Sequence, residues 1–376
     1  MGRTKVLIVV NYVLEGGLTH VLLDVLRALN NRCDVTVLTI FDLYTEYIEE
    51  IKILAKYNTL DCWRRKISNN VLLSLYSRLI MDNRAFQVFL YNYYVSRHQF
   101  DIEVAFAEDW AINVVAKSKS RSRKYAWIHT DFLCDGVNDR ETLISNTRLM
   151  LQRFDRTIFV SELLKQKFTT LLSLSKTISV PNAVDVDAIY KKSLCSCDIT
   201  MNQDVLNLVF VGRLNHEKGV EILIDSMACL PEEYVKRCHL YIIGDGCERK
   251  FLETKIRENN LKNIFLLGAK QNPFPYVKQS SYLILPSKYE GFGLVLIEAM
   301  ALGVPCIATK TVGATEVLDN GKYGIMVDYN KESISNAIKE CILYPEKRIA
   351  YQSLQKTKLQ AYTMDKYREQ LNTLFQ

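Results

Sequence analysis

The sequence lacks several patterns that would place it in well-known classes of protein. Its ten cysteines include no C-x-x-C pair, and no histidine stands at the spacing of a zinc ligand. No run reaches the roughly 18 apolar residues that a membrane-spanning helix needs. The formal net charge of +6 over 376 residues is too small to indicate a nucleic-acid-binding protein. We therefore expect reduced cysteines, no metal and a cytoplasmic location.

Ordinary globular material makes up most of the chain. Hydrophobic residues are 48% and charged residues 24% of the total, which excludes long disordered or collagen-like segments. A length of 376 residues favours two domains. Residues 5–14 imitate a signal peptide, but Asn11 interrupts them and no small-residue cleavage site follows, so a buried first strand is expected there. The close pair of Cys195 and Cys197 is predicted to be incidental.

Short β-branched runs alternate with amphipathic segments along the chain. Most runs are continuously apolar, which favours strands covered on both faces by helices. Strand–helix alternation predicts parallel sheets. The strands are expected at 5–10, 34–39, 102–105, 124–129 and 156–160, and then at 205–211, 239–243, 263–267, 282–285, 305–308 and 324–327.

The periodic pattern weakens once, over the polar stretch 181–203, which is therefore the expected domain boundary. The fold class predicted is α/β, with two Rossmann-like, doubly wound domains at 1–185 and 204–360 that face each other across a cleft. Residues 361–376 are expected to form a final helix. Ligands of such sheets bind beyond the carboxyl ends of the strands, so the loops there are the candidate sites.

Two loops between a strand and a helix carry candidates for phosphate binding. In the first half, Gly16 and Gly17 precede a helix pattern at 21–29; they favour an anion site or a plain turn equally, and the G-x-G-x-x-G fingerprint is absent. In the second half, Arg213 and Lys218 share the loop 212–219 and can converge on one diphosphate. Two solvated surface charges are the alternative for that pair.

The most specific stretch is 286–305, which has the pattern of a strand, a glycine-bearing loop, a helix and a second strand. Gly291 and Gly293 permit close approach of a ligand, and the amides of Gly293 and Leu294 lie at the positive end of the helix dipole. Glu290 is in the loop and Glu298 is well inside the helix. Separate roles are expected for these two carboxylates.

Several ordered motifs now point to one family. They are G-R-L-x-x-x-K-G at 212–219, G-D-G at 244–246, L-G at 267–268, P-S-x-x-E-G-F-G-L-x-x-x-E-A-M-A at 286–301, V-G-A-T-E at 312–316, V-P-N-A-V-D at 180–185 and, in the first half, W-I-H at 127–129. Together they resemble the retaining glycosyltransferases of family 4, which have the GT-B fold. The resemblance is strongest over 205–328.

The resemblance implies a donor that is a nucleotide-diphosphate sugar, UDP-linked by preference, bound mainly by the second domain without metal or cofactor. It places Arg213 and Lys218 on the diphosphate, Glu290 on the sugar hydroxyls and Glu298 on the ribose. It also implies that His129 contacts the donor sugar near the reacting carbon. The other donor-binding residues expected are Gly16, Gly17, Gly268, Phe292, Gly293, Leu294 and Val295. The final helix is expected to pack on the first domain, as it does in this family.

A D-x-D triplet at Asp185 and Asp187 needs separate interpretation, because metal-dependent glycosyltransferases of another fold use such a triplet to hold a divalent ion. Here it falls in the family-like P-N-x-V-D context at the domain boundary. We therefore predict a structural role and no metal-dependent catalysis.

Residues 51–100 mix cations with aromatic and aliphatic side chains. A surface of this kind can bind an anionic bilayer, although a core-facing helix with a solvated basic side is an almost equal alternative. No RNA-binding motif accompanies it. By analogy with similar bacterial enzymes, a saccharide or lipid-linked saccharide acceptor in capsule, O-antigen or exopolysaccharide synthesis is expected. The cations are Lys52, Lys56, Arg64, Arg65, Lys66, Arg78, Arg84 and Arg97.

Three other functions are compatible with parts of the pattern. A nucleotide-sugar 2-epimerase shares the architecture but needs further acid/base residues. A non-catalytic nucleotide- or glycan-binding module is disfavoured because Arg213, Lys218, Glu290 and Glu298 are all present. A dinucleotide dehydrogenase is the least favoured, because its glycine fingerprint is missing.

Overall fold

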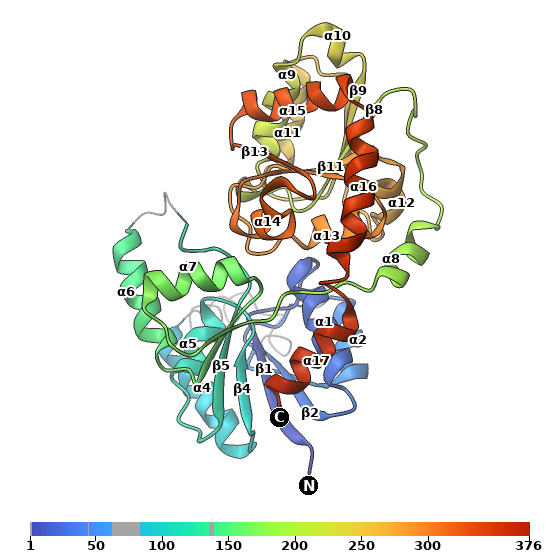
Figure 1. Ribbon diagram of the computed structural model, residues 1–376. Coiled ribbons are helices and arrows are strands. Elements are labelled where there is room, and N and C mark those ends of the chain that lie inside the picture. The colour runs from blue at the N-terminus through green and yellow to red at the C-terminus, as the bar shows by residue number, and fades with distance from the viewer. Residues whose placement is uncertain (1, 44, 62–82, 135–138) are drawn as a thin grey trace, which may run out of the picture. The chain divides into compact units, whose positions relative to one another are not determined.

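The computed structural model describes residues 2–43, 45–61, 83–134 and 139–376. The chain divides into two compact units. Unit 1 comprises Met1–Pro181 together with Tyr367–Gln376, and unit 2 comprises Asn182–Lys366. Each unit is built on its own parallel sheet (Figure 1).

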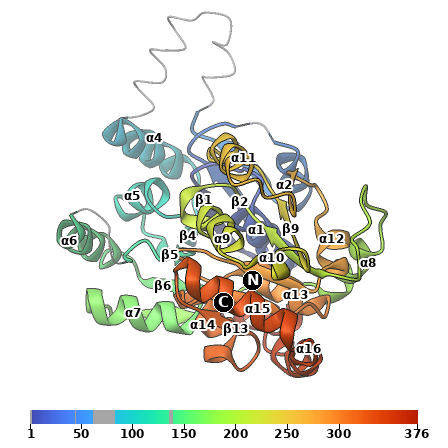
Figure 2. The same ribbon diagram turned by 90° about the horizontal axis from the view of Figure 1, so that it is seen from above.

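Unit 1 has a seven-stranded parallel sheet in the order β3-β2-β1-β4-β5-β6-β7. Its strands are β1 Thr4–Val10, β2 Cys33–Thr39, β3 Lys56–Thr59, β4 Ile102–Ala105, β5 Arg123–Ile128, β6 Arg156–Phe159 and β7 Thr177–Ser179. Its helices are α1 Gly17–Leu29, α2 Tyr47–Leu54, α4 Arg84–Arg97, α5 Trp110–Ala116, α6 Arg140–Leu151, α7 Glu162–Leu172 and most of α17 Met364–Leu374. Helices α4 to α7 follow one another around the β4–β7 half (Figure 2).

Unit 2 has a six-stranded parallel sheet in the order β10-β9-β8-β11-β12-β13. The strands are β8 Leu206–Val211, β9 Cys238–Ile243, β10 Ile264–Gly268, β11 Tyr282–Leu285, β12 Cys306–Thr309 and β13 Ile325–Val327. The helices are α8 Val186–Ser193, α9 Val220–Ala228, α10 Glu232–Val235, α11 Arg249–Glu258, α12 Phe274–Gln279, α13 Leu294–Ala301, α14 Val312–Val317, α15 Lys331–Leu343 and α16 Glu346–Leu359, with short 3-10 turns at His216–Lys218 and Asp319–Gly321.

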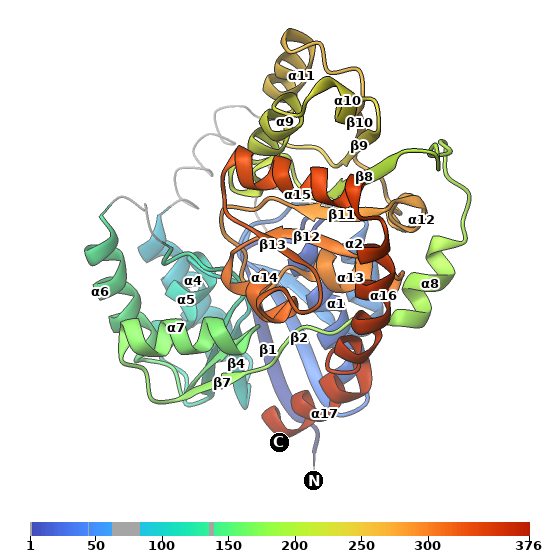
Figure 3. The ribbon, with the colours of Figure 1, turned by 45° about the horizontal axis from the view of Figure 1, so that its top comes forward.

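The strands are buried on both faces, as their continuous apolar pattern predicts. In β1, Val6, Leu7, Ile8 and Val9 are all completely buried, so residues on both sides of the strand face covered space. In unit 2, α9, α11 and α15 share one core with the strands, and α13 lies against β11 and β12 on the other side of the sheet (Figure 3). The predicted α/β class with two doubly wound sheets is confirmed.

The structure corrects the sequence interpretation in three places. Strands β3 and β7 are present at the two edges of the first sheet, where no strand is expected. Residues 56–59, interpreted as part of a helical basic segment, form β3 instead. The stretch 181–203, interpreted as lacking periodic structure, contains α8. The middle of the predicted membrane-binding segment, residues 62–82, lies outside the described residues.

The C-terminal segment packs on unit 1. Tyr367, Leu371 and Leu374 of α17 are buried, the ring of Phe375 lies 6.2 Å from that of Tyr125 in β5, and a guanidinium nitrogen of Arg123 donates to the backbone oxygen of Gln376 at 3.0 Å. The end of the chain is therefore held by burial of one apolar helix face together with a hydrogen bond. Within the described ranges, no helix is long and apolar enough to cross a bilayer.

Candidate donor site

The second sheet changes direction between β8 and β11. From β8 the chain moves outward to β9 and β10, and from β11 it moves the other way to β12 and β13. At such a switch point the loops beyond the carboxyl ends diverge and leave a crevice for a ligand. The two loops concerned are 212–219 after β8 and 286–293 after β11, which hold most of the residues predicted for the donor.

These two loops contact each other through backbone atoms. The amide of Lys288 donates to the carbonyl of Glu217 at 2.8 Å. Gly219 has φ +65°, and a Cβ at this position would lie 2.0 Å from the carbonyl oxygen of Pro286. Only glycine fits this backbone conformation and this close approach without strain. The G-R-L-x-x-x-K-G motif thus ends on a glycine that joins the two sides of the crevice.

Lys218 and Glu290 form an ion pair between the two loops. The Lys218 Nζ lies 2.7 Å from the Glu290 Oε2, with the two side chains 22% and 17% exposed. The Ser287 hydroxyl donates weakly to the same oxygen at 3.4 Å. Arg213, at the start of the first loop, is exposed and makes no ion pair or side-chain hydrogen bond with any residue the structure describes. One predicted cation is thus held by a carboxylate and the other is accessible.

Helix α13 begins directly after the second of these loops. Its N-cap residue is Gly293, in the left-handed region at φ 81°, and no side chain caps the helix. The first amides, including those of Leu294 and Val295, have no partner within the helix, and the helix dipole adds positive potential there. Glu298 lies further along α13 and is half-buried. The helix therefore presents amides at its start and a carboxylate one turn later.

The loop after β12 packs against the loop 286–293 and holds it in place. The amide of Gly313 donates to the carbonyl of Glu290 at 2.9 Å, and a Cβ on Gly313 would lie 2.4 Å from the backbone nitrogen of Phe292. The ring of Phe292 is buried against Tyr362, with 5.6 Å between ring centroids. The side chain of Phe292 therefore anchors the loop, and its backbone is packed against Gly313.

The G-D-G and L-G motifs bring three neighbouring loops together. A Cβ on Gly244 would lie 1.8 Å from the carbonyl oxygen of Gly212, and one on Gly246 would lie 2.4 Å from that of Leu214. The amide of Gly244 also donates to the carbonyl of Gly268 at 2.9 Å. The loops after β8, β9 and β10 are therefore packed backbone against backbone, which fixes the base of the loop that carries Arg213.

Gly16 and Gly17 lie at the corresponding switch point of the first sheet, between β1 and β4, whereas His129 follows β5, the next strand beyond β4. Gly16 is the N-cap of α1, with φ 148°, and Gly17 is its first residue. Nothing lies within 4 Å of a Cβ built on either glycine. The space at the start of α1 is open, so these glycines are not required by packing.

His129 follows β5 and is surrounded by aromatic side chains. Its ring centroid is 4.6 Å from that of Phe106 and 5.8 Å from that of Trp127. Its Nε2 is buried and has no hydrogen-bond partner among the described residues. Desolvation lowers the pKa of His129 to about 3, so the imidazole is neutral at physiological pH.

Glu108 holds the backbone at His129, a role that the sequence interpretation missed. Its Oε1 accepts the amides of His129 and Thr130 at 2.6 and 2.8 Å. Asn11 in turn donates to the carbonyl of Glu108 at 2.9 Å and accepts the amide of Ala111 at 2.9 Å. Asn11 comes directly after β1 and Glu108 shortly after β4, and polar residues in these positions beyond two buried, adjacent strands were the available signal.

Asp185 of the D-x-D triplet accepts the amide of Ala188 at 2.9 Å and caps α8. This contact supports the predicted structural role, since N-cap aspartates satisfy amides at helix starts. Among the described residues no group of three or more histidine, cysteine, aspartate or glutamate side chains is placed to hold a metal ion.

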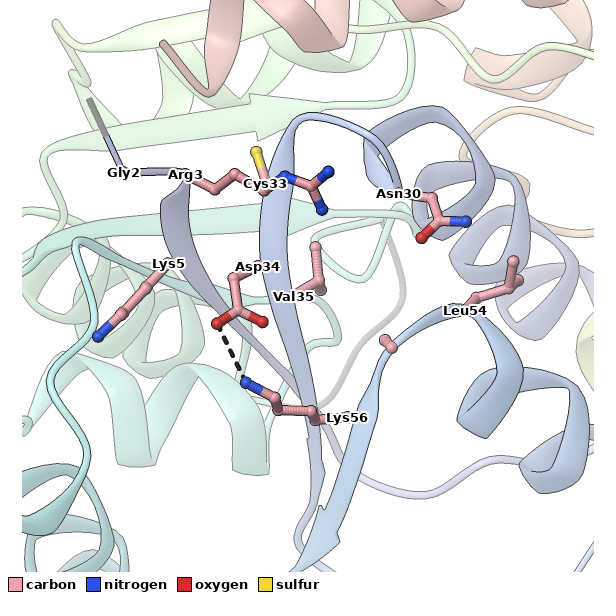
Figure 4. Close-up of a pocket in the computed structure, with 10 residues that line it drawn as sticks. Gly2, Arg3, Lys5, Asn30, Cys33, Asp34, Val35, Leu54 and Lys56 are labelled. Carbon is pink, nitrogen blue, oxygen red and sulfur yellow. Dashed lines mark hydrogen bonds and ion pairs between the residues drawn. The ribbon is translucent and has the colours of Figure 1, made fainter.

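A hollow of about 360 Å³ lies elsewhere in unit 1, lined by residues that include Arg3, Cys33, Asp34 and Lys56 (Figure 4). The ammonium of Lys56 pairs there with Asp34 at 3.1 Å. Because these residues are at the amino ends of β1, β2 and β3, the hollow is at the opposite edge of the sheet from the switch-point loops. It contains none of the predicted site residues.

Comparison with known proteins agrees with the motifs. Residues 198–356 match the family model described as glycosyl transferases group 1. An uncharacterized glycosyltransferase of Methanocaldococcus jannaschii is 32% identical over 192 residues, which are 50% of this chain and 49% of that protein. The N-acetylgalactosamine-N,N'-diacetylbacillosaminyl-diphospho-undecaprenol 4-alpha-N-acetylgalactosaminyltransferase of Campylobacter jejuni is 30% identical over 184 residues, 48% of each chain. The chain spans about half the length of these curated relatives.

A solved structure extends the likeness to the whole fold. HepE of Anabaena, crystallised in complex with UDP-glucose, matches with a TM-score of 0.77 and 20% identity, and the match covers 99% of both chains. The predicted GT-B fold class is confirmed by this match. The predicted resemblance to the glycosyltransferases is confirmed by the family model and by the relatives.

Proposed function

We propose that this chain is a retaining, metal-independent glycosyltransferase that moves a hexosyl group from a UDP-sugar to a glycan or lipid-linked saccharide in surface polysaccharide synthesis. The observation that carries this proposal is the meeting of three features at one switch point of unit 2. These are the loop with Arg213 and Lys218, the loop with Glu290, and the uncapped start of α13. A cation pair beside free amides suits a diphosphate, and nearby carboxylates suit hydroxyl groups.

The charge that develops on the leaving diphosphate explains the choice of side chains. Arg213 and Lys218, with the amides of Gly293, Leu294 and Val295, stabilise that charge without a metal ion. Glu290 accepts hydrogen bonds from the donor sugar and Glu298 accepts them from the ribose. In this proposal the departing phosphate oxygen helps to take the proton of the acceptor hydroxyl, which attacks from the same face of the sugar. The new glycosidic bond then keeps the anomeric configuration.

His129 contributes from unit 1 as a neutral group beside the donor sugar. A neutral imidazole can accept or donate a hydrogen bond without opposing the positive charge that grows on the reacting carbon. Gly16 and Gly17 leave open space for the acceptor or the donor phosphate at the start of α1. These roles of His129, Gly16 and Gly17 are the ones that the family resemblance implies.

The proposal extends to the acceptor. It places the enzyme in the cytoplasm, bound peripherally to an anionic membrane through residues 51–100. The described part of this segment supports it through α4, where Phe89 and Tyr93 are exposed and Arg97 lies 4.7 Å from the ring centroid of Tyr93. Exposed aromatic rings beside a guanidinium are suited to the interface of a bilayer with anionic headgroups. The C. jejuni relative carries an undecaprenol-linked saccharide in its name, which favours a lipid-linked acceptor here.

A thermal unfolding screen of nucleotide sugars is the first test. A ligand at about 100 times its Kd stabilises the folded state by about 2.7 kcal/mol, which is readily measured as a higher Tm. We expect one or more UDP-sugars to raise the Tm and Lys218→Met to abolish the increase. Absence of any stabilising nucleotide sugar in the wild-type protein would refute the proposed donor site.

The donor identified in this way then separates the proposed reaction from its alternatives. Labelled donor and a saccharide acceptor should give a glycoside with the anomeric configuration of the donor by NMR, in the presence of EDTA. Epimerised donor without acceptor would instead indicate a 2-epimerase. Binding with no turnover on any acceptor would indicate a binding module.

A further inference from the structure

The contact between Lys218 and Glu290 joins two groups that the proposed function assigns to different parts of the donor. The proposed function places the ammonium on the diphosphate and the carboxylate on the sugar, yet the two groups are 2.7 Å apart and mostly buried. Both hydrogen bonds of the carboxylate, from Lys218 and from Ser287, end on Oε2. Oε1 accepts none from the described residues and is not buried. One carboxylate oxygen thus holds the cation while the other is available.

An anion that binds Lys218 must therefore come close to the Glu290 carboxylate. A phosphate oxygen in hydrogen-bond contact with the Lys218 Nζ lies within about 6 Å of the carboxylate, because the Nζ is already in contact with it. Both side chains are about four-fifths buried, so solvent and salt screen the repulsion between the two anions poorly. The geometry also makes Glu290 compete with the phosphate for the protons of the Lys218 ammonium.

The intact donor and the free nucleoside diphosphate differ in what they offer Glu290. An intact donor places sugar hydroxyls beside the available Oε1, and a charge-assisted hydrogen bond offsets the repulsion. A nucleoside diphosphate has no sugar there and carries more negative charge on its terminal phosphate. The carboxylate therefore has little net effect on the affinity for the intact donor, and it lowers the affinity for the nucleoside diphosphate.

From this geometry we infer that Glu290 is a specificity-determining residue that weakens binding of the free nucleoside diphosphate relative to the intact donor, and so speeds release of the product. The inference rests on the proposed function and adds a second role to Glu290 beyond contact with the sugar. Product release limits turnover in many well-evolved enzymes. A carboxylate that weakens the binding of the product alone makes this release step faster.

The test is calorimetric titration of the whole 376-residue chain with UDP, and with GDP and ADP in parallel so that base preference does not hide binding. Glu290→Gln keeps the size and hydrogen-bonding capacity of the side chain but removes its charge. We expect it to bind UDP about 5–20-fold more tightly than wild type, with most of the gain retained at 1 M salt because the two charges are mostly buried. Lys218→Met should weaken UDP binding, and in Lys218→Met the further change Glu290→Gln should have a smaller effect than in the wild type.

The matched control is Glu340→Gln, which removes one negative charge from the same unit. Glu340 pairs with Lys347 at 2.9 Å near the carboxyl end of α15, and both side chains are exposed. Since α15 begins just after β13 and runs back along the sheet, Glu340 is far from the switch-point loops. This variant should bind UDP as the wild type does.

The outcomes separate failure of the inference from failure of the proposed function. Unchanged or weaker UDP binding by Glu290→Gln, in a protein where Lys218→Met does weaken binding, would overturn the inference and leave the donor site intact. Wild-type protein that binds none of the three diphosphates would overturn the donor site itself. Equal gains in Glu290→Gln and Glu340→Gln would show a general charge effect and also overturn the inference.

Discussion

The loops at the switch point of unit 2 are held by glycines, whereas those of unit 1 are held by side chains. In unit 2, Gly219, Gly244 and Gly313 let one backbone segment approach another to distances at which a Cβ would clash. In unit 1, nothing crowds Gly16 or Gly17, and the loops after β1 and β4 are joined through the side chain of Asn11, while the Glu108 carboxylate joins the loop after β4 to that after β5. The same architectural position is therefore stabilised by close backbone packing in one unit and by side-chain hydrogen bonds in the other.

This difference explains what each unit reveals in its sequence. Close backbone packing permits only glycine, so unit 2 carries recognisable glycine motifs at fixed spacing. A side-chain hydrogen bond to a backbone amide needs only one acceptor at one position, and Asn11 and Glu108 form no motif with a fixed spacing. The following variants break or sharpen the comparison, in order of decreasing effect.

Gly219→Ala should have the largest effect. Its Cβ would strain a backbone at φ +65° and also lie 2.0 Å from the carbonyl oxygen of Pro286. We expect loss of measurable donor binding and a fall of more than about 3 kcal/mol in the free energy of unfolding. Gly303→Ala is the matched control, because Gly303 has φ +71° but open space around it. Gly303→Ala should lower the free energy of unfolding by only about 1 kcal/mol. If urea unfolding gave the same loss for both variants, backbone strain and not the contact between the loops would explain the effect of Gly219→Ala.

Glu290 and Glu298 should separate in steady-state kinetics. Glu290→Ala is expected to lower kcat about 100-fold with the donor KM within about threefold of wild type, since the proposed function places Glu290 on the reacting sugar. Glu298→Ala is expected to weaken nucleotide binding about 10–100-fold, because a charge-assisted hydrogen bond to a neutral group is lost. Parallel changes in kcat and KM for both variants would contradict this division.

In unit 1 the corresponding variant is Glu108→Ala. Loss of the acceptor for the amides of His129 and Thr130 should shift the histidine and lower kcat about 10–100-fold. Glu108→Gln keeps an acceptor oxygen and should restore most of the rate. The neighbouring Asp109→Asn is the control, because its pair with Arg84 is exposed and weak. If Asp109→Asn were as harmful as Glu108→Ala, the specific role of Glu108 would be wrong.

The continuous apolar runs were sufficient to predict all the central strands, because a strand covered on both faces leaves a strong signal. Both missed strands are at the edges of the first sheet. In β3, Lys56–Thr59, exposed and half-buried residues alternate, and β7, Thr177–Ser179, has three half-buried residues. Helix α8 is short, and half of its residues are polar. Its Asp185 cap and the lysines of its last turn were the available signals.

The candidate site was predictable to the extent that it depends on backbone geometry. The residues of the two loops of unit 2 were found from their motifs. Their contact was not, because Lys218 and Glu290 are 72 residues apart and meet only through the adjacency of β8 and β11. Glu108 and His129 are 21 residues apart and follow the adjacent strands β4 and β5. Such contacts depend on strand order, which alternation of strands and helices does not determine.

His129 gives unit 1 a pH dependence with a definite sign. The pKa of this buried imidazole is lowered to about 3, whereas an unfolded histidine has a pKa of about 6.5. The unfolded chain therefore binds the proton first, so stability is lost as pH falls from about 6.5 towards 3 and is unaffected above that range. Between pH 7 and 4.5, His129→Gln should lose about 2 kcal/mol less stability than wild type in urea unfolding.

The titration of the neighbouring Glu108 has to be separated from that of His129. Burial raises the pKa of Glu108, so its protonation has the opposite sign and stabilises the folded state as pH falls. The measurement is therefore repeated in the Glu108→Gln background, where the change in the pH profile caused by His129→Gln should persist. If His129→Gln no longer changed the pH profile in the Glu108→Gln background, the pH dependence would belong to the Glu108 carboxylate.

The smallest expected effect concerns the outer surfaces of the two units. Helix α4 of unit 1 exposes Phe89 and Tyr93 beside Arg97, whereas α16 of unit 2 exposes Ile349 without an aromatic neighbour on the same helix face. If α4 binds an anionic bilayer, Arg97→Gln should reduce flotation with phosphatidylglycerol vesicles about fivefold, since one interfacial cation contributes about 1 kcal/mol. Ile349→Ser, which removes a more exposed apolar side chain from unit 2, should leave flotation unchanged. Equal flotation of the wild type with neutral and anionic vesicles would exclude an electrostatic contribution of α4. Reduced flotation of Ile349→Ser would indicate that the membrane contact is on unit 2.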